Sequence, residues 1–558
     1  IHLACRTIAK GNLEVEILPE TRLPQKEMEK VFEKSREFKL VEIPIEKIFS
    51  FSPLIEKCFL RLPPPSIEDN VSDLERIYRD LKKFNITYPH IDLPTLRRIP
   101  RLLRESKWEI TLSICNCNGE KEIVLVEPSD TSRKNFGVAV DVGTTTITAR
   151  LINLNNGETL KTEISYNKQG TYGEDIITRI IHAEKEDGLE ALHHLVVETI
   201  NELIESLAEN CSVNLSEISC VVCSGNTTMM HLLLKIDPSF LRREPYIPTT
   251  NSFPVIKAAE VGIRINPSGI LRVIGGVSSY VGGDITSGVL ATQIHKKEEL
   301  SMLVDIGTNG EIVLGNKDWM VCCSASAGPA FEGSGVKDGM RAIAGAIQSV
   351  EIKEEKVFIK TINDEPPLGI CGSGYVEIIS ELFTNNLIDR AGRLTESQRI
   401  REGEDGKEYV VVFGKDTGHG RDIVITQVDI ENLLRAKAAI YAGMMMLLKK
   451  TGVELGNVER IYIAGGFGSY LNIKKSITIG LLPDLEENKF KFMGNTSLLG
   501  AKAYILSEEA RKLTEEIPKK MTYIDLSLEP EYMDEYLSAL FIPHTRIELF
   551  PSVKKWLA

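Results

Sequence analysis

The same short pattern occurs twice in this chain, and it limits the folds that the chain can adopt. In the first copy, apolar residues from Phe136 lead to Asp141, a turn of glycine and threonine follows, and alternation resumes through Leu151. The second copy, Leu303 to Leu314, repeats the strand, the aspartate (Asp305), the glycine and the threonine. Each copy predicts a β-hairpin, and an internal duplication indicates a fold built from two similar halves.

The tips of both hairpins have the chemistry of a phosphate-binding site. A glycine lets the backbone approach a ligand closely, and threonine hydroxyls and backbone N–H groups donate hydrogen bonds to phosphate oxygens. An aspartate at the end of the strand can hold a hydrated Mg²⁺ ion. One such hairpin also fits an ordinary β-turn, whereas two favour a nucleotide site. The candidate phosphate contacts are Gly143, Thr144, Thr145, Thr146, Gly307, Thr308 and Asn309.

A third segment, Ile461 to Gly468, is an apolar strand that ends in glycines, which leave room for a ribose or a flat ring. Gly465, Gly466 and Gly468 are therefore candidate contacts of a nucleoside. Hairpin, hairpin and glycine-ended strand, in that order, resemble the phosphate-1, phosphate-2 and adenosine motifs of the actin-like ATPase superfamily of sugar and acetate kinases, heat-shock chaperones and actin. The resemblance implies an α/β fold with a two-lobed, ribonuclease-H-like duplicated core.

Composition narrows the class of protein. The chain has 558 residues, 42% hydrophobic and 26% charged, which is enough for two to four globular domains. It contains no apolar run of roughly eighteen residues and no secretory signal, so we expect neither a membrane span nor export. Its 10 cysteines follow no regular framework, which favours thiols in a reducing cytoplasm. The net charge of −13 argues against a nucleic-acid partner.

The first residues carry Cys5 and, after it, an alternating strand that ends at Leu18. This pattern looks like the last cysteine ligand and closing strand of a plant-type 2Fe-2S ferredoxin domain, whose other three cysteines lie upstream. Residues 1–19 are therefore interpreted as the remnant of such a domain, with a cluster only in a longer chain. A lone buried thiol would also explain Cys5. Residues 20–44 are charged and predict a linker.

Residues 45–133 predict a small α+β middle domain, and residues 134–558 the actin-like core. Helices are expected over 73–84 and from Pro94 to Ser106, and strands over 108–114 and 123–126. Cys115 and Cys117 are spaced C-x-C, which is compatible with a metal site. Because no second pair follows nearby, we interpret them as structural or incidental thiols.

Further polar residues precede the second hairpin. Asp284 begins a small-residue helix, at a spacing before Asp305 similar to that of the connecting-helix acid in the superfamily, which implies a metal-water or base role. An ordinary helix N-cap explains Asp284 almost as well. Ser278 and Ser279 precede it in a loop that we expect to move with the nucleotide.

Other polar side chains leave two interpretations open. Asn167, Gln169 and Asp175 either reach the cleft or only shape a turn. His231 lies one turn into a helix predicted after Gly225, and we expect it to be packed and not catalytic.

Seven motifs, preceded by the ferredoxin-like remnant, resemble a narrower family, the reductive activators of corrinoid proteins. The resemblance is strongest from residue 136 to about 545. The motifs are Asp-Val-Gly-Thr-Thr-Thr (141–146), Gly-Asn-Thr-Thr-Met (225–229), Tyr-Val-Gly-Gly-Asp (280–284), Asp-Ile-Gly-Thr-Asn-Gly-Glu (305–311), Ala-Ser-Ala-Gly-Pro-Ala-Phe-Glu-Gly (325–333), Ile-Cys-Gly-Ser-Gly (370–374) and Ala-Gly-Gly-Phe-Gly (464–468).

The resemblance implies that ATP hydrolysis drives one electron from a 2Fe-2S cluster to a Co(II) corrinoid, restoring the Co(I) state that methyl transfer requires. It implies ATP and Mg²⁺ as cofactors, a corrinoid protein and a low-potential electron donor as partners, and a homodimer as one expected state. Asp141, Asp284 and Asp305 would be catalytic, with Asp141 and Asp305 organising Mg²⁺ or the attacking water. Two alternatives remain: a small-molecule kinase of the same fold, and a chaperone-like ATP-dependent binding module.

Overall fold

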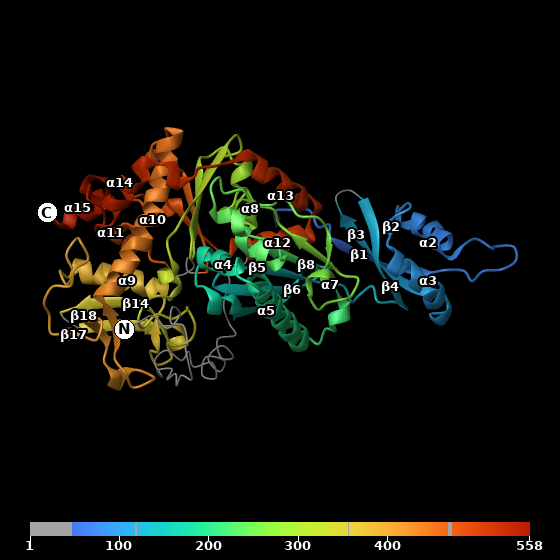
Figure 1. The fold of residues 1–558 in the computed structure, drawn as a ribbon, viewed down its shortest axis with the longest axis horizontal. Helices are drawn as coiled ribbons and strands as arrows, with labels where there is room; N and C mark the ends of the chain where they lie inside the picture. The colour runs from blue at the N-terminus through green and yellow to red at the C-terminus, as the bar shows by residue number, and fades with distance from the viewer. Residues whose placement is uncertain (1–46, 118–119, 355, 467–470, 558) are drawn as a thin grey trace.

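The computed structural model describes residues 47–117, 120–354, 356–466 and 471–557. Figure 1 shows an elongated molecule with the small N-terminal domain at one end and two larger lobes beside it. Residues 134–297 form the first lobe, and most of the later residues form the second. The candidate residue Cys5, the 1–19 remnant and the 20–44 linker lie outside the described residues, as does Gly468.

The small domain is a four-stranded sheet covered by two helices, with strand order β1-β3-β4-β2. Both predicted helices are confirmed, and each begins at a capping side chain: Ser72 accepts a hydrogen bond from the backbone N–H of Glu75, and Asp92 from that of Thr95. The elements are β1 (Ile55–Arg61), α2 (Asp73–Leu81), β2 (His90–Ile91), α3 (Leu93–Glu105), β3 (Glu109–Cys117) and β4 (Glu120–Pro128).

Cys115, on β3, is held in a disulfide bond. The expectation that it is a thiol is therefore wrong. The sequence hid this because a C-x-C spacing alone specifies neither a metal nor a disulfide.

Each lobe contains a six-stranded sheet built on one of the two hairpins. In the first, β5 pairs antiparallel with β6 and parallel with β8; in the second, β11 pairs antiparallel with β12 and parallel with β20. The first sheet, in spatial order, is β7 (Thr159–Tyr166), β6 (Thr146–Asn153), β5 (Phe136–Val142), β8 (Ile218–Ser224), β10 (Ile270–Val273) and β9 (Ile256–Lys257). The second is β21 (Phe490–Gly494), β20 (Arg460–Ala464), β11 (Ser301–Ile306), β12 (Gly310–Gly315), β13 (Met320–Ala325) and β22 (Met521–Tyr523).

Five strands of each sheet therefore repeat one topology, an antiparallel three-strand meander followed by two parallel strands. The sixth strand differs, since β9 pairs antiparallel with β10 and β22 pairs parallel with β13. This repetition confirms the duplication read from the two hairpins. The apolar strand residues pack to form the lobe cores: Val140 and Ile147 are buried in the first, and Val304 and Ile312 in the second.

Helices cover both sheets and connect the lobes. The first lobe carries α4 (Ile176–Ala183), α5 (Gly188–Cys211), α6 (Thr227–Leu233) and α7 (Ala258–Val261). The second carries α9 (Gly372–Thr384), α10 (Gln427–Thr451), α11 (Ile473–Ile479), α14 (Pro530–Ala539) and α15 (Pro551–Leu557). Between them lie α8 (Gly283–Thr292), α12 (Thr496–Leu506) and α13 (Glu508–Lys520), and α12 packs against both α8 and β5. A segment near the C-terminus thereby reaches back to the first hairpin.

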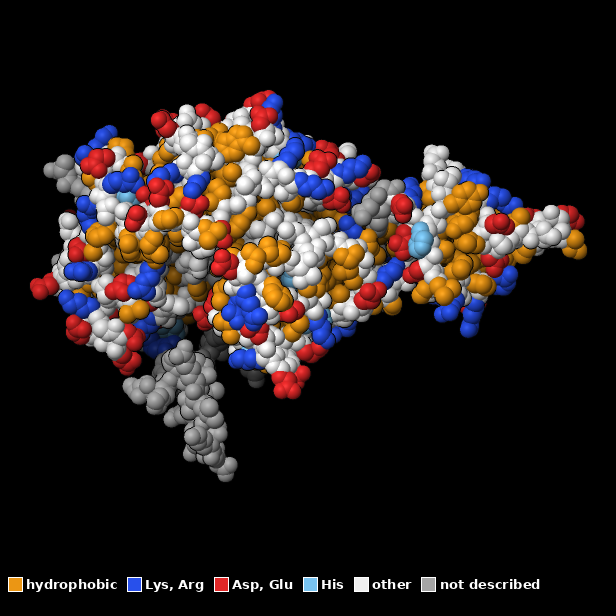
Figure 2. Space-filling model, turned by 45° about the horizontal axis from the view of Figure 1, so that its top comes forward, with side chains coloured by type: hydrophobic (Ala, Val, Ile, Leu, Met, Phe, Trp, Pro, Cys, Tyr) orange, Lys and Arg blue, Asp and Glu red, His pale blue; other side chains and the backbone are white. Residues whose placement is uncertain are grey.

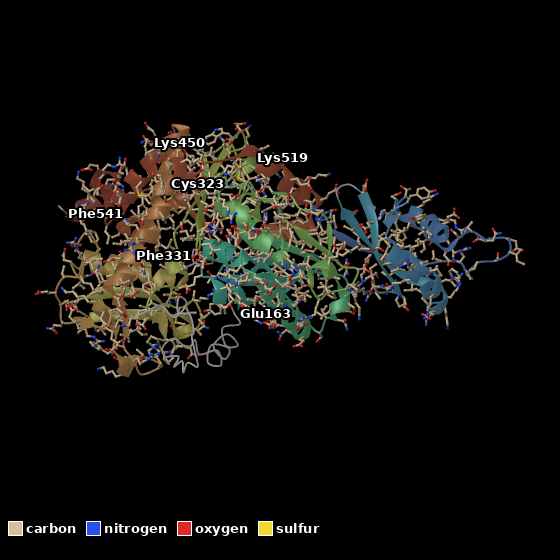
Figure 3. All side chains as sticks on the ribbon, in the orientation of Figure 1. Glu163, Cys323, Phe331, Lys450, Lys519 and Phe541 are labelled. Carbon is tan, nitrogen blue, oxygen red and sulfur yellow. The ribbon has the colours of Figure 1, made fainter. Side chains whose placement is uncertain are left out.

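Two three-stranded sheets complete the second lobe, β15-β14-β16 and β17-β18-β19. Their strands are β14 (Ala346–Lys353), β15 (Lys356–Thr361), β16 (Gly369–Ile370), β17 (Ile400–Gly403), β18 (Gly406–Val412) and β19 (Ile423–Thr426). In Figure 3, Phe331 and Cys323 lie inside this lobe, whereas Lys450 and Lys519 lie on the outside of the molecule. The methionines of α10 belong to the core, since Met444 is 1% exposed.

The surface mixes charged and apolar side chains, and the small domain projects from the two lobes (Figure 2). Within the described part of the chain, no helix combines the length and the apolar character needed to cross a membrane.

Candidate functional site

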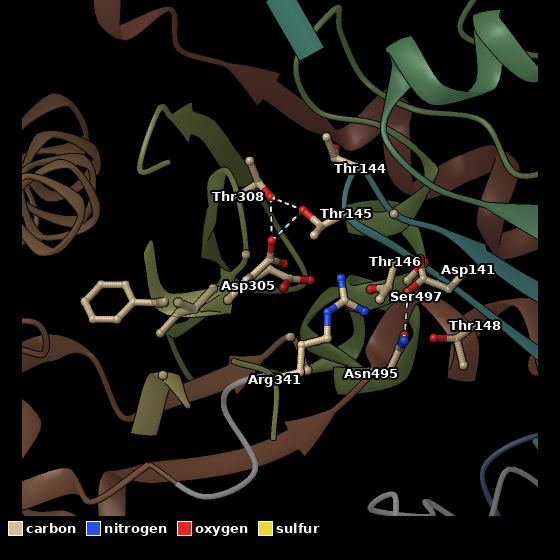
Figure 4. Close-up of a pocket in the computed structure, with 18 of the residues that line it drawn as sticks. Asp141, Thr144, Thr145, Thr146, Thr148, Asp305, Thr308, Arg341, Asn495 and Ser497 are labelled. Carbon is tan, nitrogen blue, oxygen red and sulfur yellow. Dashed lines mark hydrogen bonds between the residues drawn. The ribbon is translucent and has the colours of Figure 1, made fainter. Parts of the chain in front are cut away.

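The two hairpin tips face one cavity of about 240 Å³, which residues of both lobes line (Figure 4). The glycines that follow β20 line the same cavity, as does the start of α8. The predicted residues that it brings together are Asp141, Gly143, Thr144, Thr145, Thr146, Asp284, Asp305, Gly307, Thr308, Asn309, Gly465 and Gly466. Three motifs that are far apart in the sequence therefore form one site.

The tips of the two hairpins are in direct contact. The hydroxyl oxygens of Thr145 and Thr308 lie 2.9 Å apart. Glu332, at the end of a short 3-10 helix, accepts a hydrogen bond from each of them with the same oxygen, at 2.8 Å from Thr145 and 2.6 Å from Thr308. A carboxylate thus occupies the donors that we assign to phosphate.

Side chains around the first turn hold it in place. Asn226 donates to the Thr144 hydroxyl at 3.1 Å, Arg179 donates to the Thr144 carbonyl at 2.6 Å, and Asn167 donates to the Gly143 carbonyl at 3.0 Å. Burial lowers the pKa of Arg179 to about 10. Such a network fixes the turn before any ligand arrives.

The two interpretations of Asn167, Gln169 and Asp175 are thereby resolved: these side chains shape and hold turns. Asp175 caps α4 by accepting from the backbone N–H of Thr178, and Gln169 accepts from Arg179. His231 is fully buried, and its ring nitrogens lie 2.8 Å from the carbonyl of Thr227 and 3.2 Å from the backbone nitrogen of Thr249, so it is packed as predicted.

Five acidic side chains line the cavity and repel one another. Burial, together with the nearby Asp141, raises the pKa of Asp284 to about 7; burial, together with the nearby Asp284 and Asp141, raises that of Asp305 to about 8. Burial also raises the pKa of Asp141, although Asn495 and Ser497 each donate a hydrogen bond to it at 2.7 Å. The lining acids are Asp141, Asp284, Asp305, Glu311 and Glu332. A site with this charge has the donor set for a cation.

These shifts predict how stability depends on pH in the absence of metal and nucleotide. The folded pKa values of Asp284 and Asp305 lie above the unfolded value of about 3.9, so the folded state holds more protons between about pH 4 and pH 8. Stability should therefore fall as the pH rises through that range, by roughly 2 kcal/mol after allowing for the water that reaches the cavity.

Thermal unfolding in EDTA from pH 5 to pH 8.5 measures this slope. The Asp305→Asn variant should show a shallower slope and greater stability than the wild type at pH 8. A wild-type stability that rises over this range would contradict the shifted carboxyl groups.

Sequence reasoning missed several polar side chains of the cavity. Glu311 and Glu332 belong to motifs that were noticed, but no role was assigned to either residue. Asn495 and Ser497 lie at the start of α12, and only the packing of α12 on β5 brings them to Asp141. Arg341 lies in a loop that carries no motif.

The loop of Ser278 and Ser279 lies beside the cavity lining and is held by hydrogen bonds. Thr227 donates to the Ser278 carbonyl at 2.6 Å, and the Ser279 hydroxyl donates to the Tyr246 carbonyl. Ser279 is 2% exposed, so its side chain faces the interior of the first lobe.

Comparison with protein families covers almost all of the described chain. Residues 45–133, 136–297 and 299–554 match three family models, described as the RACo linker region, the RACo middle region and the C-terminal domain of RACo, the ASKHA domain. The chain belongs to the RACo family. The match confirms the resemblance to reductive activators of corrinoid proteins and the actin-like fold.

Named relatives of this RACo-family chain act on corrinoid proteins. It is 32% identical over 431 residues to the corrinoid activation enzyme RamQ of Eubacterium limosum, an alignment that covers 75% of this chain and 72% of RamQ. It is 25% identical to the [Co(II) methylated amine-specific corrinoid protein] reductase of Methanosarcina barkeri, over 69% of this chain and 73% of the reductase.

A solved structure repeats the whole architecture. The reductive activator for corrinoid, iron-sulfur protein superposes with a TM-score of 0.87 and 45% sequence identity, covering 93% of this chain and 83% of that one. The arrangement of lobes and small domain is therefore shared within the family.

Proposed function

We propose that this chain hydrolyses ATP in the cavity between its lobes and thereby drives the one-electron reduction of a corrinoid protein from Co(II) to Co(I), the state used in methyl transfer. The observation that carries the proposal is the meeting of both hairpin turns and the Gly465–Gly466 turn in one cavity. The relatives named for corrinoid activation and Co(II) reduction supply the substrate class.

Redox arithmetic explains why ATP is needed. Co(I) is a very strong reductant, so the electron travels uphill from a ferredoxin-type donor, and each 59 mV of deficit costs roughly 1.4 kcal/mol. ATP can supply this free energy only through a change of shape. Because Thr145, Thr308 and Glu332 join the hairpins of the two lobes, a phosphate group that takes those donors must rearrange the contact.

The cavity is suited to hydrolysis by positioning and electrostatics, without a covalent nucleophile. Backbone and hydroxyl donors of the two turns hold the phosphates, and Gly465, Gly466 and Gly468 receive the adenosine. Asp284 positions water at the start of α8. Each of these roles belongs to the proposal.

The proposal includes Mg²⁺, organised through water by Asp141 and Asp305, where it would neutralise phosphate charge. The buried, mutually repelling carboxyl groups fit such an ion: burial and then mutual repulsion raise their pKa values, and a divalent cation offsets the repulsion. Among the described residues, no three His, Cys, Asp or Glu side chains are placed to bind one metal ion directly. Coordination through water requires no such cluster.

The partners follow from the same proposal. We infer a low-potential electron donor, with a 2Fe-2S cluster bound by Cys5 and upstream cysteines in a longer chain, and a homodimer in the cytoplasm. The loop of Ser278 and Ser279 is the proposed contact with the corrinoid protein, because it immediately precedes α8 and Asp284. In this proposal the half-buried Ser278 faces the partner, and the buried Ser279 holds the shape of the loop through its hydrogen bond to the Tyr246 carbonyl.

ATP turnover with and without a Co(II) corrinoid protein tests the function. A form of the chain with its N-terminus extended to include the cluster should hydrolyse ATP faster with the Co(II) protein, and the Co(I) absorption band should appear only when ATP and a reductant are both present. In the same assay, alanine at both Ser278 and Ser279 should reduce activation while leaving basal hydrolysis intact.

Three outcomes would contradict the proposal. Turnover that needs a sugar or an organic acid would indicate a kinase of the same fold. Turnover stimulated by unfolded peptide instead of the corrinoid protein would indicate a chaperone-like module. Formation of Co(I) at the same rate without ATP would show that ATP hydrolysis does not drive the reduction of Co(II).

A further inference from the structure

The charge of the cavity poses a problem for a triphosphate ligand. Five carboxyl groups line it, and among the described lining residues Arg341 is the one with a cationic side chain. ATP carries several negative charges, so its binding next to these acids needs positive charge at close range. The guanidinium of Arg341 lies in the cavity with these acids and can supply that positive charge.

The backbone around Arg341 is fixed. The residue lies in the loop between the 3-10 helix that ends at Glu332 and strand β14. Met340 donates its backbone N–H to the Ile370 carbonyl at 2.9 Å, and Ile343 donates to the Arg341 carbonyl at 2.8 Å. The side chain extends from this loop into the cavity, as Figure 4 shows.

The guanidinium bridges from the second lobe to the first. Its central carbon lies 3.8 Å from the centre of the Tyr166 ring. Tyr166 is the last residue of β7 and pairs with Thr146 of the first phosphate turn. A cation over an aromatic face gains roughly 0.5–2 kcal/mol, and the stacked geometry leaves the N–H edge of the guanidinium available. Tyr166 therefore aims Arg341 alongside the first hairpin.

The donors of Arg341 lack an acceptor in the described structure. No described residue forms a hydrogen bond or an ion pair with its guanidinium. Burial lowers the pKa of Arg341, and the nearby Tyr166 and Glu332 offset this only in part. Arg341 is half-buried, and a partly desolvated charge without hydrogen-bond partners in the protein gains free energy from a ligand with suitable acceptors. A planar guanidinium matches the oxygens of a phosphate group.

We propose that Arg341 is a catalytic residue that binds the terminal phosphate of ATP and stabilises the charge that develops there during hydrolysis. This inference rests on the proposed ATPase function. In that step the water oxygen bonds to the terminal phosphorus while the bond to the bridging oxygen breaks; ADP leaves with the electron pair, and the proton of the water passes to solvent. Arg341 keeps its proton throughout and supplies charge and two N–H donors.

Tyr166 is then a positioning residue for this step. It belongs to the first lobe and Arg341 to the second, so the guanidinium reaches the phosphate only when the lobes are as close as in this structure. A change in lobe separation would withdraw the charge from the terminal phosphate. Hydrolysis is thereby linked to lobe closure.

The test compares Arg341→Ala and Arg341→Lys with the wild type, with Arg435→Ala as the matched control. Arg435 is an exposed arginine of α10 whose side chain pairs only with its own helix among the described residues. For each variant, ATP and ADP affinities are measured by calorimetry and turnover by phosphate release. Arg341→Ala should lower kcat by about 10²- to 10³-fold, the cost of removing one preorganised transition-state donor.

The ratio of the two affinities separates this role from a structural one. Arg341→Ala should weaken the binding of ATP at least about tenfold more than the binding of ADP, because only ATP has the terminal phosphate that the guanidinium contacts. Arg341→Lys should recover part of the ATP affinity and little of kcat, since it keeps the charge without the planar fork. Tyr166→Leu should lower kcat by a larger factor than it lowers the affinity for ADP.

Several results would overturn the proposal. Equal losses of ATP and ADP affinity would assign Arg341 to the nucleoside or to packing, and an unchanged kcat would remove it from catalysis. If Arg341→Ala does not fold, Arg341→Lys gives the same comparison with the charge retained. A wild-type protein that hydrolyses no ATP, even with the corrinoid protein, would refute the proposed function instead, so the two failures are distinguishable.

Discussion

Replacing Asp305 with asparagine is expected to reduce ATP hydrolysis by about 10²- to 10⁴-fold and to abolish ATP-dependent Co(I) formation. Asp305 lies near the end of β11, the first strand of the second hairpin, and interacts electrostatically with Asp284, Asp141 and Glu332. Asparagine keeps the size and removes the charge that would organise Mg²⁺ and water. The loss should therefore appear in kcat, with the fold unchanged.

The measurement is phosphate release at saturating ATP and Mg²⁺, beside thermal unfolding of the same sample. Asp318→Asn is the matched control, because Asp318 is an exposed acid in the turn between β12 and β13. The Asp305 variant should also be more stable than the wild type above pH 7, since burying the charged carboxylate is costly. An Asp305→Asn protein with normal turnover would exclude this residue from the site.

The same substitution at two adjacent glycines should have different effects on the stability of the protein. At Gly465 the backbone φ is +97°, and a β-carbon would lie 2.4 Å from the Ile306 carbonyl oxygen and 2.9 Å from a carboxylate oxygen of Asp305. Gly465→Ala should therefore destabilise the protein by about 2 kcal/mol or more and displace Asp305. At Gly466 a β-carbon would meet no atom of the described residues within 4 Å, so Gly466→Ala should fold normally.

Both glycines line the cavity, so ATP binding supplies the second measurement. Gly466→Ala should keep its unfolding temperature but bind ATP more weakly, because its methyl group enters the space assigned to the adenosine. Gly465→Ala should lose stability and turnover together. Equal stability of the two variants would contradict the close approach of β20 to β11. Normal ATP affinity in Gly466→Ala would show that the adenosine does not bind next to Gly466.

The second lobe shows how far local sequence reasoning reached. The segment from Leu303 to Leu314 predicted a hairpin with Asp305 before its turn, and the structure has β11 and β12 there. Alternating apolar residues and a glycine turn are local signals, and a strand pairs with its sequence neighbour over a short loop. The twelve predicted residues of the cavity that are described follow from such signals and from the resemblance that they carry.

The residues that sequence reasoning missed depend on packing between distant segments. Asn495 and Ser497 reach Asp141 because α12 packs against β5, and no spacing in the chain reports that contact. Glu332 became significant only when its carboxylate was found between Thr145 and Thr308. Cys115 was misread for the same reason, since its redox state depends on geometry.

The sequence by itself determined the two hairpins, the glycine-ended strand, the duplicated α/β core and the family resemblance, because turn chemistry and alternation act over a few residues. Only the tertiary structure decided which charged groups are buried together in the cavity. That arrangement raises the pKa values of Asp284 and Asp305, and the same packing places Arg341 over Tyr166. Burial and Coulomb interactions depend on distance in space, and distance in space is set by how the lobes pack.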